Sequence, residues 1–292
     1  MPDTDDPLLD HLSEVQISFI RSLLGVHKRS VLAPLYTETG LAPLKYRRID
    51  IALRYLQYAV ECAPDTYVAD AIADSIALAA SNAQSWFMDL QLVILKLRGP
   101  FALSSGRDAA TQDIELLRSR IEAHMGQEFS LELRNNKKLY LLLDRKGPAC
   151  AMRGYLKILN GQHREALTRL LLSCHTLAVE RLRWVERYRD YVPYAERTCR
   201  LCKTEVETPE HVLLVCPADD DITSLRGTYL ERMAEVHDAL PEWMADGDAT
   251  AYLRHLLSLD ISIALTAEWI YDTMLLIDRQ PMLVPAAYIR RY

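Results

Sequence analysis

The segment TCRLCKTEVETPEHVLLVCP, residues 198–217, decides how this chain is organised. Cys199, Cys202, His211 and Cys216 stand in it with the spacing C-x2-C-x8-H-x4-C. Three thiolates and one imidazole satisfy a tetrahedral zinc ion, and a two-residue gap lets one tight turn present the first two sulfurs together. Because four protein ligands close the coordination shell, the sequence predicts one structural zinc ion. The alternative is a set of reduced core cysteines beside a surface histidine.

Residues that start a helix lie between the two halves of this motif. Thr208 is suited to cap a helix whose first position is Pro209. His211 and Cys216 are five residues apart, about 140° around a regular α-helix, so a regular helix cannot direct both side chains at one ion. Pro217 disfavours the helical conformation at the residue before it. We therefore expect the helix to end at Cys216 and the chain to turn that thiol back toward the other ligands.

The remaining cysteines bear on the environment of the protein. Cys62, Cys150 and Cys174 lie far apart in the sequence and are predicted to be buried apolar residues, and His175 is predicted to be a packed core histidine. Six cysteines stay reduced in a cytosolic or nuclear setting. The acidic first ten residues do not resemble a secretory signal. We expect an intracellular protein, nuclear or cytoplasmic, that is not secreted and does not bind a membrane.

Composition favours helices over strands. The 292 residues are 50% hydrophobic and 25% charged and include only 10 glycines, while alternating β-branched runs are scarce. The predicted fold class is all-α, an irregular array of several helices with one small CCHC zinc knuckle inserted. The longest uncharged stretch, residues 75–88, contains Ser, Asn and Gln and is too short and polar to cross a bilayer.

Apolar periodicity places the expected helices. In residues 11–24, the positions Leu12, Val15, Phe19 and Leu23 follow helical spacing. A second helix is expected to start near Pro43, and residues 37–40 are expected to form a turn before it. Further helices are expected at residues 70–97 (one or two), from about 109 to a cap at Gly126, 153–159, 164–172, 176–188, 223–240, 249–257 and 261–277. Residues 128–134 fit a helix better than a strand without a partner.

Charge divides the chain into blocks. The net charge is −6 for residues 1–133, +9 for 134–206 and −9 for 207–292. We therefore expect an N-terminal helical region at 1–133, a basic helical segment with the zinc module at 134–218, and an acidic C-terminal helical region at 219–292. A basic block of this size suits phosphates, or it pairs with the acidic flanks of the same chain.

The basic residues nearest the zinc module are the candidates for contact with RNA or DNA. They are Arg134, Lys137, Lys138, Arg145, Lys146, Arg153, Lys157, Arg164 and Arg169. Tyr140, Tyr155 and Trp184 are interleaved with them and could stack on unpaired bases. The alternative is a solvated basic face over core aromatics, in a helical scaffold that binds another protein.

The cysteine segment and two other stretches of the chain resemble a known family. The residues ALTRLLLSCHTLAVERLRW at 166–184, followed by RTCRLCKTEVETPEHVLLVCP at 197–217, resemble the C-terminal zinc-binding region of reverse transcriptases from non-LTR retrotransposons, particularly fungal ones. Residues 19–58 resemble the helical segment that follows the polymerase domain in those proteins. The resemblance implies zinc ligands at Cys199, Cys202, His211 and Cys216.

The departures from that family argue against an enzyme. A polymerase needs an Asp pair after an aromatic residue to hold two metal ions, but Asp5-Asp6 follows Thr4 and Asp219-Asp220-Asp221 follows Ala218. Some relatives carry a nuclease that uses a lysine after the zinc motif, whereas Lys203 is the last lysine of this chain. The expected protein is a non-catalytic accessory module derived from such an element, or a decayed fragment of one.

Overall fold

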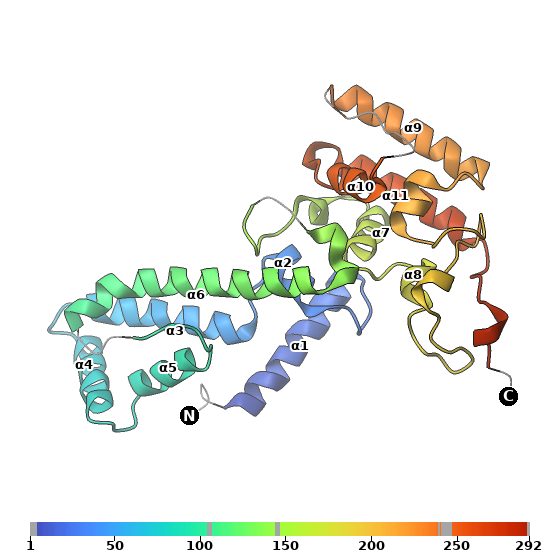
Figure 1. Cartoon of the computed structure of the whole chain (residues 1–292). Helices are drawn as coiled ribbons and strands as arrows, with labels where there is room; N and C mark the ends of the chain where they lie inside the picture. Colours follow the sequence, from blue (N-terminus) through green and yellow to red (C-terminus); the bar gives the residue numbers. More distant parts are fainter. Residues whose placement is uncertain (1–4, 104–106, 144–146, 239, 241–246, 291–292) are drawn as a thin grey trace. The chain divides into compact units, whose positions relative to one another are not determined.

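Helices make up the regular secondary structure of the computed structural model, which describes residues 5–103, 107–143, 147–238, 240 and 247–290 (Figure 1). Within these ranges, the β-type pairings are isolated bridges such as the one between Thr198 and Val206. The predicted all-α class is confirmed. No helix in this described part is both long enough and apolar enough to cross a bilayer.

The chain divides into two compact units. Unit 1 comprises Met1–Ile20, Leu35–Glu132 and Pro148–Ala151. Unit 2 comprises Arg21–Pro34, Leu133–Gly147 and Met152–Tyr292. Unit 2 therefore contains the whole cysteine cluster, most of the basic segment and the acidic C-terminal region.

Among its described residues, unit 1 is built on helices α1 to α6, of which α1, α2 and α6 extend into residues of unit 2. They are α1 (Asp6–Leu24), α2 (Leu32–Thr39), α3 (Leu44–Glu61), α4 (Tyr67–Ala80), α5 (Trp86–Leu95) and α6 (Arg107–Asn135). The buried apolar faces of α3, α5 and α6 supply the core, with Leu53, Phe87 and Ile114 fully buried. Polar contacts also join α3 to α6: Asp50 accepts from Arg118 at 3.0 Å, and Tyr46 donates to Glu128 at 2.6 Å.

Several predicted boundaries in unit 1 are wrong. The helix predicted to end at Gly126 continues through it to Asn135, so residues 128–134 are helical as predicted. The expected turn at 37–40 belongs to the end of α2, which finishes where Gly40 adopts φ +71°. The stretch 70–97, predicted as one or two helices, forms two, α4 and α5, because Asn82 turns left-handed at φ +59° and Ser85 caps α5 by accepting from the Met88 N–H.

The helix predicted at residues 11–24 is confirmed as α1, but its exposed face carries much of its apolar character. Leu12, Val15, Phe19 and Leu23 are each more than half exposed, whereas Ile20 and Leu24 are buried. The helix is therefore apolar over a wider arc than the surface it covers.

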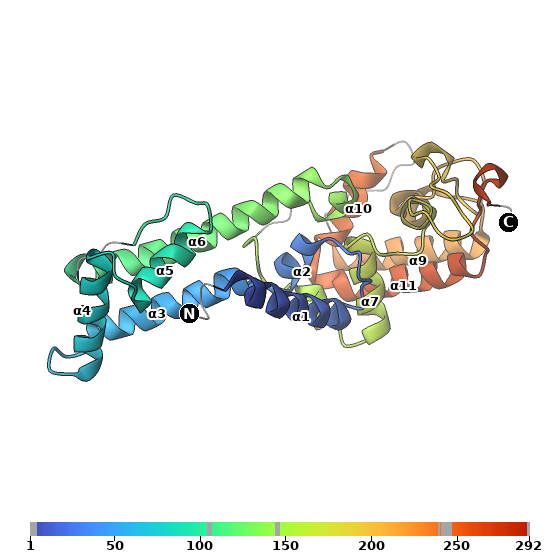
Figure 2. The ribbon, with the colours of Figure 1, turned by 90° about the horizontal axis from the view of Figure 1, so that it is seen from below.

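Unit 2 is arranged about the helix α11 (Ile263–Asp278), which contacts α7 (Gly161–Leu171) and α9 (Asp220–Val236). Figures 1 and 2 show α9 running alongside α11. The other elements are α8 (Ala178–Arg181), α10 (Ala249–Leu257), a widened turn at His211–Val215, and the 3-10 turns Lys137–Leu142, Gly154–Lys157, Tyr194–Glu196, Asp260–Ser262 and Ala286–Tyr288. The helix α10 has its predicted bounds, but the helix predicted at 176–188 is only the single turn α8.

Candidate metal centre

The first two cysteines lie on a tight turn. Lys203 closes it by donating its backbone N–H to the Cys199 carbonyl at 2.9 Å, in a left-handed conformation with φ +63°. The Cys199 N–H donates to the Glu205 carbonyl at 2.7 Å, and the chain on either side of the turn forms an isolated antiparallel bridge between Thr198 and Val206. The turn fixes both sulfurs on the same side of the loop, as the two-residue gap predicts.

A helix start and a widened turn place the other two ligands. Thr208 accepts the His211 N–H at 3.2 Å, which confirms the predicted cap. From His211 to Val215 the turn is a π-helix, and the Cys216 N–H donates to the His211 carbonyl at 2.7 Å. Because this hydrogen bond joins residues i and i+5, His211 and Cys216 lie one above the other along the turn.

A regular helix would separate the His211 and Cys216 side chains by about 140°, and the structure removes this separation in a way that the sequence did not predict. Cys216 does leave the helical conformation before Pro217, at φ −58° and ψ 122°. However, the widened turn supplies most of the correction. Arg226 of α9 stabilises it by donating to the carbonyls of Leu213 at 2.7 Å and Cys216 at 2.8 Å, which a regular helix end leaves without partners.

The four side chains converge with the spacing of a tetrahedral site. Their ligand atoms all lie within 4.8 Å of one another, with 3.9 Å between the sulfurs of Cys199 and Cys216 and 3.4 Å between Cys202 Sγ and His211 Nε2. Zn–S bonds of about 2.3 Å and Zn–N bonds of about 2.0 Å give edges of about 3.8 and 3.5 Å. This cluster can hold a metal ion, and its donors match zinc.

The surroundings favour the thiolate at two of the three sulfurs, those of Cys202 and Cys216. Burial raises the pKa of Cys202, but hydrogen bonds from the backbone at Glu205 and from Thr204 outweigh it, so its pKa lies below the usual value. At Cys216, the hydrogen bond from Cys199 is the main cause of a pKa of about 4, and that shared proton raises the pKa of Cys199. Thiolate is the form of cysteine that binds a metal.

The other cysteines lie apart from this cluster. Cys62, Cys150 and Cys174 are partly buried, which corrects the prediction that they are buried. Burial raises the pKa of Cys174 to about 11, so its thiol is protonated at neutral pH. His175 is buried as predicted, and its Nδ1 accepts the Leu177 N–H at 3.3 Å.

A buried ion pair that sequence reasoning missed joins the ligand loop to the helices of unit 2. Glu207 is fully buried and pairs with Arg200 at 2.8 Å, while its carboxylate also accepts the N–H groups of Arg200 and Ala178 at 2.8 Å each. The Arg200 guanidinium reaches the carbonyls of Thr176 at 3.0 Å and Gln280 at 3.2 Å. The ligand loop is thus tied to the start of α8 and to the end of α11.

Apolar contacts reinforce this attachment. Val212, from the widened turn, is fully buried with Leu177, Ile222 of α9 and Ile277 of α11, and Leu201 packs against this group. The cysteine–histidine cluster therefore belongs to the core of unit 2 rather than to a separate appendage.

The predicted nucleic-acid residues are distributed over several elements of unit 2. Arg134, Lys137 and Lys157 are exposed. Lys138 lies 3.9 Å from the buried Glu180, Arg164 donates to the Ile158 carbonyl at 2.6 Å, and Arg169 pairs with Glu165. Arg153 is partly buried, and Arg145 and Lys146 lie outside the described residues.

The aromatic residues near these cations differ in their surroundings. Tyr155 is only 3% exposed, so it presents no face for stacking. Tyr140 is partly buried and donates to Glu210 at 2.5 Å. The ring of Trp184 lies against the guanidinium groups of Arg29 and Arg183, at 5.0 and 4.9 Å from its centroid.

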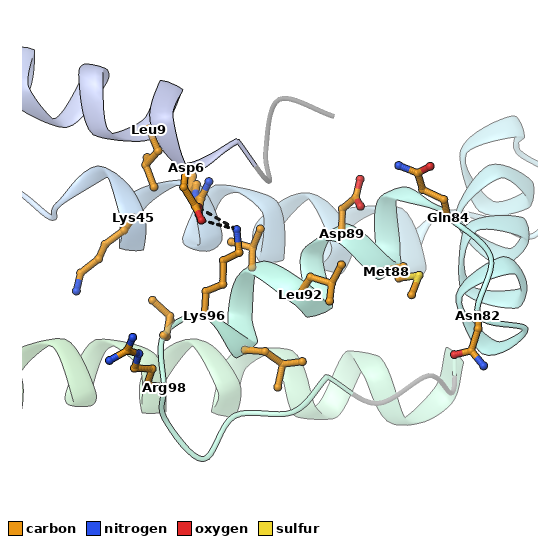
Figure 3. Close-up of a pocket in the computed structure, with 14 residues that line it drawn as sticks. Asp6, Leu9, Lys45, Asn82, Gln84, Met88, Asp89, Leu92, Lys96 and Arg98 are labelled. Atoms are coloured by element: carbon orange, nitrogen blue, oxygen red, sulfur yellow. Dashed lines mark hydrogen bonds and ion pairs between the residues drawn. The ribbon is translucent and has the colours of Figure 1, made fainter.

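A groove of about 990 Å³ lies on unit 1. Figure 3 shows Met88 and Leu92 of α5 beside it and Lys96 reaching Asp6, with 2.8 Å between the charged groups. The groove contains no residue of the cysteine cluster and none of the predicted nucleic-acid residues. It therefore adds no chemistry to the candidate site.

Comparisons with models of protein families, with curated proteins and with solved structures found no match to this chain. The chemistry of the site therefore rests on the residues themselves.

We expect Glu207→Gln to lower the free energy of unfolding of unit 2 by about 3 kcal/mol, because it leaves the buried Arg200 without its main counter-charge. Urea unfolding followed by circular dichroism measures the loss. Glu205→Gln is the matched control, because that side chain is exposed in the same loop and its replacement should cost less than about 0.5 kcal/mol. Equal effects of the two variants would contradict a structural role for the pair.

The buried His175 predicts a pH dependence of stability. Burial, with a smaller contribution from Lys138, lowers its pKa to about 4, whereas the unfolded chain titrates near 6.5. Between these values the unfolded state binds a proton that the folded state does not, so stability should fall by up to about 3 kcal/mol as the pH falls from 6.5 to 4. Above this window the contribution is fully present.

The comparison that isolates this effect is between wild type and His175→Asn. The Asn carbonyl oxygen can still accept the Leu177 N–H, but it does not titrate. Loss of metal ligation at low pH affects both proteins equally, so it cancels in the difference of their unfolding free energies. Parallel pH profiles for the two proteins would show that His175 is not the group responsible.

Proposed function

We propose that Cys199, Cys202, His211 and Cys216 bind one structural Zn²⁺ ion. The observation that carries this is the convergence of four protein ligand atoms within 4.8 Å, with donors and spacing suited to tetrahedral zinc. The bound ion would cross-link the loop at 199–203 to the widened turn at 211–215. Binding free energies of structural zinc sites are about 10 kcal/mol or more, comparable to the stability of a whole domain.

The proposed module is non-catalytic. Three thiolates and one imidazole fill the coordination shell, which leaves no position at which zinc would activate water. The reverse-transcriptase resemblance supports the same proposal, because it covers the accessory zinc region and lacks the polymerase and nuclease motifs. An intracellular location, nuclear or cytoplasmic, fits this proposal, since the six cysteines are all unpaired thiols.

The proposed role of the module is to contact RNA or DNA through its cationic residues. Arg134, Lys137 and Lys157 are exposed and have no ion pair to any described residue. Exposed cations of this kind attract nucleic-acid phosphates without reading the base sequence.

A helical scaffold that binds another protein is the second candidate. Internal partners of Lys138, Arg164 and Arg169 favour it, because these cations contribute to the structure of unit 2 itself. In that case zinc would only maintain the fold, and the intact chain would not bind nucleic acid.

The zinc proposal predicts one zinc ion per purified chain, measured by elemental analysis. Cys202→Ser should abolish bound zinc and the cooperative unfolding of unit 2, because the remaining three ligands no longer close the site. Cys62→Ser, a partly buried thiol in unit 1, is the matched control and should retain full zinc content. A metal-free wild type with the same stability in the presence of a strong chelator would refute the proposal.

The nucleic-acid role predicts that the full zinc-loaded chain binds labelled single-stranded RNA or DNA at low salt. Fluorescence anisotropy should show an affinity that falls steeply with salt, by about 0.7 decades per decade of salt for each phosphate neutralised. No binding to either polymer, or an affinity that does not change with salt, would favour the scaffold.

A further inference from the structure

A short basic loop at residues 25–30 is held firmly in unit 2. Arg169 donates to the Gly25 carbonyl at 2.9 Å, and Gly25 adopts φ +65° with Glu165 packed so closely that a Cβ would lie 2.8 Å from its side chain. Arg21 closes the loop by donating to the Ser30 hydroxyl at 3.1 Å and to its carbonyl at 2.9 Å. The exposed residues Lys28 and Arg29 are therefore presented by a fixed backbone.

Glu180 anchors the surface beside this loop. Its side chain is only 4% exposed, and it pairs with Arg183 at 3.0 Å and with Lys138 at 3.9 Å. The Trp184 ring N–H and the Ser173 hydroxyl also donate to it, at 3.3 Å each. One carboxylate thus orders two cations and an indole ring.

The Trp184 ring in turn holds the guanidinium group of Arg29. Cation–π contacts place Arg29 and Arg183 about equally far from the ring centroid, at 5.0 and 4.9 Å. The Arg29 guanidinium has no hydrogen-bond acceptor among the described residues, so its donors are available to a ligand. Its position is set before any ligand binds, which lowers the entropy cost of binding.

The cluster carries an excess of positive charge. Lys138 and Arg183 pair with the carboxylate of Glu180, and Arg29 joins them through the Trp184 ring, so three cations face one carboxylate and two positive charges remain uncompensated. Lys28, the exposed neighbour of Arg29 in the loop, adds a further cation. A planar guanidinium with free donors matches the oxygens of a phosphate group, with which it forms paired hydrogen bonds.

We infer that this cluster, formed by Lys28, Arg29, Lys138, Arg183 and Trp184, is the phosphate-binding centre through which unit 2 contacts the backbone of a nucleic acid. The inference rests on the proposed nucleic-acid role and locates it. Arg29 is the residue that donates to phosphate most directly, although it lies outside the basic segment of the sequence. Lys138 and Arg183 supply charge while Glu180 fixes their positions.

The test compares Arg29→Gln with Arg279→Gln in the full zinc-loaded chain. Both remove one exposed arginine charge of unit 2, but Arg279, at the end of α11, belongs neither to the cluster nor to the cations of the proposed role. Fluorescence anisotropy with a short labelled single-stranded RNA should show an affinity about tenfold lower for Arg29→Gln, with a salt slope reduced by about 0.7. Arg279→Gln should change the affinity by less than about twofold.

Arg29→Lys provides a second check, because it keeps the charge but loses the planar fork, and it should recover only part of the affinity. Unchanged zinc content and thermal unfolding of the variants would exclude a loss of fold. Equal losses for Arg29→Gln and Arg279→Gln would overturn the inference and leave a diffuse basic surface as the contact. Absence of nucleic-acid binding by the wild type would overturn both the inference and the proposed function.

Discussion

The ion pair between Glu207 and Arg200 is the point at which the cysteine loop, the start of α8 and the end of α11 meet. Glu207 accepts from the side chain and the N–H of Arg200 and from the N–H of Ala178, while Arg200, between Cys199 and Cys202, donates to the Gln280 carbonyl. A buried ion pair of this kind gives little net stability, because desolvation offsets most of the attraction. The pair instead fixes the orientation of the loop that carries Cys199 and Cys202, because a displaced loop would leave both charges buried and unpaired. The convergence of the four ligands therefore depends on helices that are far away in the sequence, and the metal centre and unit 2 are expected to fold as one cooperative unit.

Much of the helical structure follows from apolar periodicity, and the errors have identifiable causes. The helix α10 has the predicted bounds because its ends coincide with the cap at Asp248 and with the last apolar residue of the pattern. Gly126 suggests a helix end, yet α6 passes through it, because packing along a long helix outweighs the cost of about 1 kcal/mol for one glycine. In α1 the periodicity is real, but apolar residues cover two adjacent arcs, and spacing cannot tell which arc meets the core.

The ligand set could be read from the sequence because the residue types and the cap at Thr208 are local features. The widened turn could not be predicted from the sequence. It depends on Arg226 of α9, which donates to carbonyls that the turn leaves without partners. Arg200 and Glu207 were missed for a related reason. Charged residues next to cysteines suggest a solvated loop, and only the tertiary structure reveals that both are buried. The residues around Glu207, KTEVETPE at 203–210, are mostly polar, so the local sequence does not signal its burial.

The charge blocks of the sequence acquire a different meaning in unit 2. The described ion pairs of the basic segment run largely to its own acids: Lys138 and Arg183 to Glu180, Arg169 to Glu165, and Arg181 and Arg189 to Glu186. Arg200 does pair with Asp278 of the C-terminal region, at 3.5 Å, but its own guanidinium is buried. On α9, Asp220, Asp221, Glu231 and Glu235 are exposed, and their described surroundings provide no ion pair. Because the acidic flank leaves exposed cations such as Arg29 uncompensated, an anionic polymer would be attracted to one part of unit 2 and repelled by another, which favours a defined orientation of binding over uniform adhesion.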